Sequence, residues 1–513
     1  MSTPLLCAGT AVGIIDVGSN TVRLSVVETL PAGGYRVRHE QKVNLRLGAR
    51  IRADGCLGPE AAEETARVVA DFVATGADWA VGTWLAVGTA AVRQAADGPA
   101  FLRTVMERTG LTIRLLAGEE EARLGLVGAL NTLGEPEGYA VDIGGASTEL
   151  TRFVARRVRE SLSLPLGAVN ASARFGMLDR APASSVQALR QELEARVTAA
   201  GWLRQQPGGV LIGIGGTVRA LSKLDRKRRG YPLHGVHNYL LDPTEAARQA
   251  ERLAAMTARE RQRLPGMAAE RADLMAAGAC LLAWAIERTR PSRVVVSGSG
   301  LREGLFYSHL LADQPEPLFP DVLEASVANL EVCYGLPAPR ATRLAALAAA
   351  LWEHLGPLAG APAPLARLLP AAARLREVGT AVSYYDWQQH TFYVLREARL
   401  YGVDHRERLL LAAAAAYNGA GRVREQLQPF DAILQPGDDR LAVRLGIAAA
   451  LAHALDRACH GRALPLQVST LPSAVRIATG APPASGFTPG ALGEDFRKWF
   501  GRALGVVPGE ATL

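Results

Sequence analysis

The feature that most constrains the fold is a pattern that occurs twice, about 126 positions apart: a short apolar strand, an aspartate, a turn of small residues and a second strand. The first copy is Ile15-Asp16-Val17-Gly18-Ser19-Asn20-Thr21, and the second is Val141-Asp142-Ile143-Gly144-Gly145-Ala146-Ser147-Thr148-Glu149. Glycine lets a ligand approach the backbone closely, and serine and threonine add hydroxyl donors, so both turns suit phosphate oxygens. Two copies indicate a duplicated fold, with the two turns on facing walls of a cleft.

Acidic residues at both ends of the second turn predict a metal ion. Asp142 and Glu149 would repel a phosphate group unless a cation lies between them. Mg²⁺ binds through one or two carboxylates together with substrate oxygens. The working hypothesis from these residues is a metal-assisted phosphoryl-transfer site.

Short apolar strands alternate with helices around the two copies. We expect strands at 12–15, 22–27, 84–87, 113–116, 139–143, 210–214 and 294–296, and helices at 59–75, 99–109 and 119–130. Such alternation is typical of α/β architecture. We place one α/β domain at 1–130 and a second one at 131–312.

Two further glycine-rich turns follow apolar strands in the second of these domains. Gly215-Gly216-Thr217 opens a helix, and backbone donors at a helix N-terminus form a ready anion site. Ser297-Gly298-Ser299-Gly300 precedes another helix. Each turn alone is a weak signal, but four in one chain, all after strands, favour phosphate binding. Acidic residues at 119–121 also suit the first turn of a helix for purely electrostatic reasons, and local sequence favours that explanation for any one of them.

A Pro-rich stretch at 313–320 reads as a linker, and helical periodicity dominates after it. Apolar residues recur at helical spacing in 344–355, 406–417 and 441–458. We therefore expect an all-α domain at 321–513, with an irregular tail from about Ser473.

Composition adds a few limits on location and partners. The net charge is +7 and the cations are mostly arginine, which suits an acidic partner, although a codon bias explains the same composition. The five cysteines are scattered and fit no zinc pattern, and no apolar run reaches the roughly 18 residues of a membrane span. We expect no signal peptide and a cytoplasmic protein that binds neither membrane nor nucleic acid. The basic run at 225–229 reads as a solvated loop.

Taken together, these motifs resemble the exopolyphosphatase / guanosine pentaphosphate phosphohydrolase (Ppx/GppA) family, whose fold is that of the actin-like, ribonuclease H-like ATPases. The order and spacing of the motifs match over positions 12–307. The matching segments are 15–24, Val87-Gly88-Thr89-Ala90-Ala91-Val92-Arg93, Gly118-Glu119-Glu120-Glu121-Ala122-Arg123, 142–149, 215–217, Glu270-Arg271-Ala272-Asp273 and Gly300-Leu301-Arg302-Glu303-Gly304. One departure is Ala146, which stands where the family usually has a third glycine.

The resemblance implies roles for individual residues. It makes Glu121 the catalytic base, against the electrostatic explanation, and it makes Asp142 and Glu149 the ligands of Mg²⁺ or Mn²⁺. Arg271 is placed near the cleft by analogy only. The phosphate-binding residues that it implies are Ser19, Asn20, Arg23, Arg93, Gly144, Gly145, Ala146, Ser147, Thr148, Gly215, Gly216 and Thr217.

The C-terminal half resembles the HD-like domain of the long members of this family, with a degenerate metal site. The segment Leu375-Arg376-Glu377-Val378-Gly379 lacks the usual His-Asp pair, while His390, His453 and Asp456 remain nearby in the pattern. A complete ligand set is needed for a metal site, so we expect none here. The domain is expected instead to bind the substrate chain or to form a homodimer.

The expected activity is that of an exopolyphosphatase, which releases orthophosphate from the end of inorganic polyphosphate. An alternative is hydrolysis of guanosine pentaphosphate (pppGpp) to ppGpp, in the stringent response, by the same chemistry. A non-catalytic sensor of nucleotide or polyphosphate and a sugar or acetate kinase on the same fold are lesser alternatives.

Overall fold

The computed structural model describes residues 10–30, 33–198, 200–204, 208–484 and 488–508. The nine N-terminal residues, about which we predicted the lack of a signal peptide, lie outside these ranges. The described chain forms two compact units, one of residues 10–30 and 35–320 and one of residues 33–34 and 321–508. No helix of the described chain is long and apolar enough to cross a membrane.

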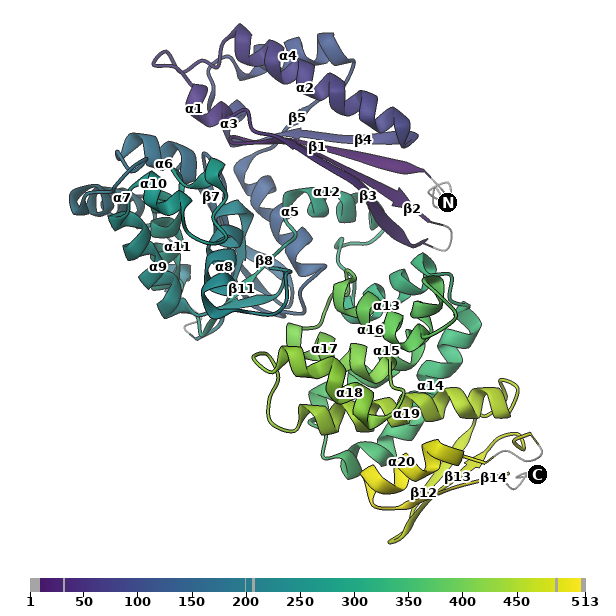
Figure 1. Ribbon diagram of the computed structural model, residues 1–513. Coiled ribbons are helices and arrows are strands. Elements are labelled where there is room, and N and C mark those ends of the chain that lie inside the picture. The colour runs from purple at the N-terminus through teal and green to yellow at the C-terminus, as the bar shows by residue number, and fades with distance from the viewer. Residues whose placement is uncertain (1–9, 31–32, 199, 205–207, 485–487, 509–513) are drawn as a thin grey trace. The chain divides into compact units, whose positions relative to one another are not determined.

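The first sheet of unit 1 is built around the first Asp-Gly hairpin (Figure 1). Its strand order is β3-β2-β1-β4-β5, with β1 antiparallel to β2 and parallel to β4. The strands are β1 (Ala11–Val17), β2 (Val22–Thr29), β3 (Tyr35–Val43), β4 (Val81–Gly88) and β5 (Arg114–Leu115). The helices of this part are α1 (Leu47–Arg50), α2 (Pro59–Asp78), α3 (Ala90–Gln94), α4 (Gly98–Thr109) and α5 (Gly118–Leu130).

Alternation along β1 decides which side chains face the site. Successive strand residues point to opposite faces of a sheet. Ala11, Ile15 and Val17 join a core cluster with α2 and α4, whereas Val12 and Ile14 join a second cluster on the other face. Asp16 has the same parity as the latter pair, so it lies on that second face at the end of the strand.

The second sheet repeats the topology of the first. Its order is β10-β11-β9-β6-β7-β8, in which β8-β7-β6-β9-β11 corresponds to β3-β2-β1-β4-β5 and β10 is an added antiparallel edge strand. The predicted duplication is therefore confirmed, and both halves are actin-like α/β domains with mixed sheets. The strands are β6 (Gly138–Ile143), β7 (Thr148–Val154), β8 (Arg157–Leu164), β9 (Val210–Ile214), β10 (Tyr239–Leu241) and β11 (Arg293–Val296).

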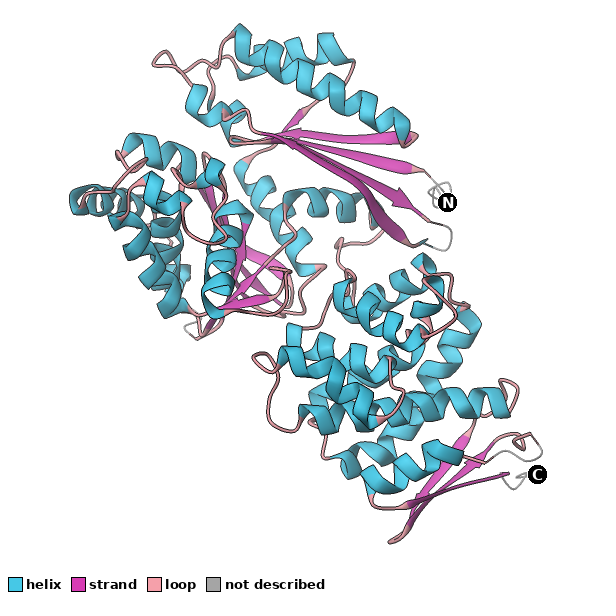
Figure 2. Ribbon diagram, viewed as in Figure 1, coloured by secondary structure: helices cyan, strands magenta, loops and turns pink. Residues whose placement is uncertain are grey.

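Helices surround the second sheet as they do the first (Figure 2). They are α6 (Ala168–Arg174), α7 (Ala183–Arg196), α8 (Gly215–Arg229), α9 (Pro243–Ala255), α10 (Ala258–Gln262), α11 (Met275–Thr289) and α12 (Leu301–Leu310), with 3-10 turns η2 (Gly201–Arg204) and η3 (Ala269–Arg271). The core is rich in small side chains from α11, which packs on α9 and α6.

The basic run at 225–229 is not the solvated loop that we predicted. It forms the last turn of α8, and Asp225 within it is fully buried. The Tyr239 hydroxyl donates to Asp225 Oδ2 at 2.7 Å, and Arg228 and Arg229 pair with the same carboxylate. The arginines thus neutralise a buried acid and also suit the helix C-terminus, which favours cations.

Helices α5 and α12 cross between the two sheets of unit 1. Leu124 and Val127 of α5 join the core beneath the first sheet, whereas Leu126 and Leu130 of the same helix join the core beneath the second. Two glycines make the crossing tight: a Cβ on Gly128 would overlap the carbonyl of Gly300, and one on Gly304 would overlap the carbonyl of Leu124. One helix therefore contributes to both hydrophobic cores.

Unit 2 is mainly helical, but it is not all-α as predicted. A three-stranded sheet of order β12-β13-β14 closes it, so the irregular tail expected from about Ser473 is wrong. Val475 and Ile477 alternate with exposed Arg476, which is a strand period that the neighbouring Pro-rich stretch at 482–489 obscured. The strands are β12 (Leu466–Thr470), β13 (Ala474–Thr479) and β14 (Ala503–Pro508).

The helices of unit 2 include the three that we predicted from periodicity. They are α13 (Val322–Cys333), α14 (Ala338–Ala359), α15 (Leu368–Arg374), α16 (Trp387–Glu397), α17 (His405–Ala415), α18 (Ala420–Leu427), α19 (Asp438–Ala458) and α20 (Gly490–Phe500), with 3-10 turns η4 (Ala363–Arg367), η5 (Val378–Ala381) and η6 (Gln428–Phe430).

Candidate active site

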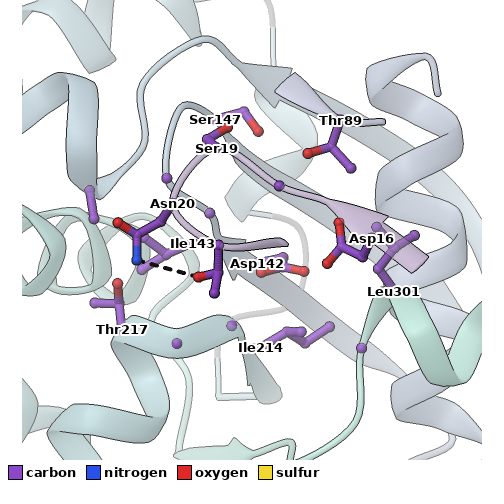
Figure 3. A pocket seen from close by; sticks show the side chains of 18 of the residues that line it. Asp16, Ser19, Asn20, Thr89, Asp142, Ile143, Ser147, Ile214, Thr217 and Leu301 are labelled. Atoms are coloured by element: carbon purple, nitrogen blue, oxygen red, sulfur yellow. Dashed lines mark hydrogen bonds between the residues drawn. The ribbon is translucent and has the colours of Figure 1, made fainter. Parts of the chain in front are cut away.

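A polar pocket in unit 1 collects the ends of strands and the starts of helices from both α/β domains (Figure 3). The two Asp-Gly hairpins, the N-termini of α3, α5, α8 and α12, and the turn η3 all reach it. The residues that line it and carry polar side chains are Asp16, Ser19, Asn20, Thr21, Arg23, Thr89, Glu121, Asp142, Ser147, Thr217, Arg219, Arg271, Arg302 and Glu303.

The two hairpins have the same internal geometry. Gly18 N–H donates to the Thr21 carbonyl at 3.1 Å, and Gly144 N–H donates to the Ser147 carbonyl at 3.0 Å. In the first hairpin Asp16 pairs across the strands with Arg23, and in the equivalent place of the second Asp142 pairs with Glu149. The duplication therefore sets an aspartate in each wall, with a cation beside one and an acid beside the other.

Four buried carboxyl groups gather here, and burial raises the pKa of each. It raises the pKa of Asp142 to about 6, and it raises that of Asp16 despite the nearby Arg23 and Arg302. Glu149 lies beneath the pocket, where burial and the charges of Glu121 and Asp142 hold its pKa well above the ordinary value. Ser163 donates to Glu149 Oε1 at 2.9 Å. Such a cluster favours either bound protons or a cation.

Glu121 stands in the first turn of α5 at the edge of this cluster. Burial, opposed by Arg93 and assisted by Asp142 and Asp16, raises its pKa to about 7. Arg93 Nη1 donates to Glu121 Oε2 at 2.9 Å and to the Leu116 carbonyl at 2.7 Å, which fixes the carboxylate. A pKa near neutrality and a fixed position suit a general base.

Arginine side chains line the same pocket. Arg219 donates to the Gly298 carbonyl at 2.9 Å, and its pKa is lowered to about 10 by desolvation and by the neighbouring Arg23. Burial likewise lowers the pKa of Arg23 and of Arg271. Arg302 is held by the Ser25 hydroxyl and by Glu40. Guanidinium groups that are crowded in this way favour an anionic ligand.

The glycine turns provide backbone donors for the same ligand. Helix α8 begins at Gly215, and its N-cap residue contributes no side-chain cap, so its first N–H groups face the pocket. Figure 3 shows Thr217 at this helix start and Ser19 and Ser147 across from it, with Asp16 and Asp142 directed into the space between. The arrangement presents both carboxylates and anion-binding donors to one ligand.

Glycines 144 and 145 serve close approach rather than an unusual backbone angle. Neither has a positive φ, and Ala146 does not have one either. A Cβ on Gly145 would lie 2.9 Å from Ser19 Cβ and 3.2 Å from the Asn20 amide nitrogen, so this glycine lets the two hairpin turns touch. The departure at Ala146 therefore costs no backbone strain.

Some predicted site residues lie outside the pocket lining. Thr148 is fully buried, and its hydroxyl donates to the Leu166 carbonyl at 2.6 Å. Ala146 is buried and accepts from Gln94 and Asn170 through its carbonyl. Arg93 and Glu149 do not line the pocket: Arg93 pairs with Glu121, and the charge of Glu121 helps to raise the pKa of Glu149. The other predicted phosphate-binding residues line the pocket.

Six polar residues of the pocket were missed by sequence reasoning as site residues. They are Asp16, Thr21, Thr89, Arg219, Arg302 and Glu303. Asp16 could have been found, because it occupies the place in the first hairpin that Asp142 occupies in the second. Arg219 lies one helical turn after the start of α8, on the side of Gly215, so helical spacing also pointed to it.

Comparison with known proteins identifies the family of the chain that contains this pocket. The family model of the Ppx/GppA phosphatase family matches residues 26–313, more than half of the chain. The chain belongs to the Ppx/GppA phosphatase family. A second model, Ppx/GppA phosphatase domain III, matches residues 322–476, so the helical unit also belongs to this family's architecture. The HD-like identity of that unit stays a prediction.

Solved structures of Ppx/GppA proteins resemble unit 1. The crystal structure of the Aquifex aeolicus family member is 28% identical, covers 60% of this chain and 99% of its own, and has a TM-score of 0.52. An exopolyphosphatase from Cytophaga hutchinsonii is 22% identical, covers 60% of this chain and 100% of its own, and has a TM-score of 0.55. At that identity the second likeness shows the fold alone.

The Ppx/GppA pocket has donors that fit a magnesium ion. Asp16 Oδ1 is buried without a hydrogen-bond partner, beside Asp142 and the other carboxyl groups whose pKa is raised. Among the described residues no three His, Cys, Asp or Glu side chains are arranged to hold a metal by themselves. Mg²⁺ needs no such cage, since it is usually held by one or two carboxylates, waters and substrate phosphates.

In unit 2, Arg340 lies among Glu377, His453 and Asp456, the residues of the degenerate metal site that the family resemblance implies. Arg340 pairs with Glu377 and lies 3.5 Å from Asp456, to which Arg343 also donates at 3.0 Å. His453 Nε2 lies 2.7 Å from the Ala373 carbonyl. Hydrogen bonding to His453 and Arg340 lowers the pKa of Glu377 to about 2. Guanidinium groups thus provide the positive charge in this cluster.

Proposed function

We propose that this Ppx/GppA phosphatase is an exopolyphosphatase, which hydrolyses the terminal phosphoanhydride of inorganic polyphosphate and releases orthophosphate. The observation that carries the proposal is the fixed, buried carboxyl of Glu121, whose pKa is about 7, in the same pocket as an arginine-lined anion site. A polyanion needs many cationic contacts and no base-recognition pocket, and four arginines line this site.

In the proposed mechanism Glu121 accepts a proton from a water molecule in line with the terminal phosphorus. Arg93 holds Glu121 in place through its Nη1 contact of 2.9 Å. The N-terminus of α8 and the turns at Ser19 and Ser147 donate hydrogen bonds to the phosphate oxygens. Because the phosphoryl group needs little covalent assistance, positioning and charge neutralisation supply most of the catalysis.

Asp142, with Glu149 behind it and Asp16 across the pocket, would hold the magnesium or manganese ion. When bound, this ion neutralises the charge that develops on the transferred phosphoryl group. Asp142 and the glycine turn lie next to each other on the second hairpin, so an anionic ligand held by the turn lies near the carboxylates. This arrangement requires a cation that balances the negative charges of the ligand and of the carboxylates.

Turnover of polyphosphate and guanosine pentaphosphate side by side by the purified full chain tests the substrate. We expect orthophosphate release from polyphosphate with a higher kcat/KM than from the nucleotide. Preference for pentaphosphate would instead assign the pentaphosphate hydrolase activity. A requirement for a phosphate acceptor would contradict hydrolysis and favour a kinase.

A further inference from the structure

One turn that lines the pocket is held in place by side chains of the other α/β domain of unit 1. Arg271 belongs to η3, a single 3-10 turn between α10 and α11, and it lines the pocket. Its guanidinium lies so close to Gly216 that a Cβ at that position would overlap it. A one-turn element has few hydrogen bonds of its own, so contacts from outside have to fix its position.

Those contacts come from Arg46, at the start of α1 in the first domain. Arg46 Nη1 donates to Asp273 Oδ2 at 2.7 Å, and Arg46 Nη2 donates to the Glu270 carbonyl at 2.7 Å. Lys42 Nζ also lies 3.4 Å from Glu270 Oε1. The guanidinium of Arg46 therefore contacts residues on both sides of Arg271. Arginine can make both hydrogen bonds at once because its guanidinium is a planar fork, whereas the single ammonium group of lysine cannot.

Arg46 is itself attached to the phosphate-binding turn of the first domain. Its N–H donates to the Asn20 carbonyl at 3.0 Å, and the N–H of Gly48 donates to the Ser19 carbonyl at 2.8 Å. Arg46 has a left-handed backbone with φ of 50°, which a non-glycine residue adopts at a cost. Local strain of this kind persists only where surrounding contacts hold it.

We propose that Arg46 and Asp273 form an interlobe clasp that positions Arg271 against the substrate when the two α/β domains of unit 1 approach each other. The clasp consists of Arg46, the Glu270 carbonyl and Asp273. It links the Ser19-Asn20 turn of one wall to Arg271 of the other, so Arg271 reaches the anion only in the closed arrangement. Arg46 and Asp273 are positioning residues, and the inference rests on the proposed function for the identity of the anion.

Binding of tripolyphosphate to the full chain, measured by calorimetry, tests the clasp without requiring turnover. Arg46→Gln weakens binding about tenfold, because it removes charge-assisted hydrogen bonds of the strong class. Asp273→Asn weakens binding to a similar extent, and Arg46→Lys weakens binding less than Arg46→Gln does but does not reach the wild-type affinity. In an Arg271→Gln background the Arg46→Gln change costs less than threefold, since the group that it positions is gone.

The kinetics of polyphosphate hydrolysis provide a second measurement, which separates the effect on KM from the effect on kcat. Arg46→Gln raises KM for polyphosphate about tenfold and changes kcat by less than threefold. Arg108→Gln is the matched control, because Arg108 pairs with Glu63 at 2.8 Å on the surface of the same domain and leaves both constants unchanged. Circular dichroism and thermal unfolding show whether each variant is folded.

Equal losses in the presence and absence of Arg271 would overturn the clasp, and so would tripolyphosphate binding unchanged by Arg46→Gln. A wild-type protein that binds tripolyphosphate but releases no phosphate from polyphosphate contradicts the proposed function alone, since the binding cycle still decides on the clasp. A wild-type protein that does not bind tripolyphosphate contradicts both.

Discussion

Glu121→Gln should stabilise the fold and abolish most of the activity. The change removes the charge of a buried carboxyl but keeps a carbonyl oxygen that accepts from Arg93. The pKa rises from 4.5 to about 7, and a difference of about 2.5 at 1.36 kcal/mol per pKa unit is ~3.4 kcal/mol as an upper limit for the ionised form. Arg93 loses its charged partner, so we expect a net gain of ~1–3 kcal/mol in the metal-free protein.

The sign of the pH dependence follows from proton binding. Between the unfolded pKa of 4.5 and the folded pKa of about 7, the folded state binds more protons, so wild-type stability falls as pH rises through this window. The advantage of Glu121→Gln is therefore full above about pH 7 and vanishes below about pH 4.5.

Urea unfolding in EDTA, followed by circular dichroism at about pH 8 and about pH 5, measures this difference. Phosphate release in Mg²⁺ is measured alongside, where loss of a general base lowers kcat about 10²- to 10⁴-fold. Glu119→Gln, on the exposed side of the same helix turn, is the control and changes neither quantity strongly. A variant less stable than wild type at the higher pH, or one with undiminished kcat, would refute the reasoning.

Three further predictions concern the turn at Gly145, the metal ion and the arginine cluster of unit 2. Gly145→Ala sets a methyl group 2.9 Å from Ser19 Cβ, so it separates the two hairpin turns and lowers kcat/KM at least tenfold, while unfolding in urea checks that the fold persists. EDTA stops phosphate release and excess Mg²⁺ restores it, and phosphate release that persists in EDTA would contradict the assignment of the acids. Arg340→Ala leaves Glu377 without its arginine partner and removes one of the two arginines near Asp456, so it destabilises unit 2 by ~2 kcal/mol in calorimetry, whereas EDTA leaves the unfolding of that unit unchanged.

The sequence predicted most of the strands and the centre of the pocket because the signals there are local. Apolar runs that end at Asp-Gly turns define both hairpins, and the family resemblance pointed to Glu121. Residues that arrive from a distance were not predictable in this way. Arg302 reaches the pocket because α12, from the end of unit 1, packs against the first sheet, and only the tertiary fold brings it beside Asp16.

Two predictions failed because a local pattern was given the wrong context. The cluster at 225–229 was interpreted by its exposed charges, although Asp225 is a buried partner of Tyr239. The strands after Ser473 are short and lie beside Pro-rich segments, so their alternation was overlooked. The burial of Thr148 has a different reason: it begins β7, and its hydroxyl satisfies the Leu166 carbonyl in the core.

The crossing of α5 and α12 restricts how the pocket can open. Because α5 is embedded in the hydrophobic cores of both sheets, neither domain can slide away from it without exposing apolar surface. Gly128 and Gly304 bring the backbones of the two helices into direct contact. We therefore expect a change in the angle between the domains to be a rotation about this crossing. Glu121 lies on α5 about one turn before Leu124, so we expect the base to move less than the walls that hold the phosphate chain.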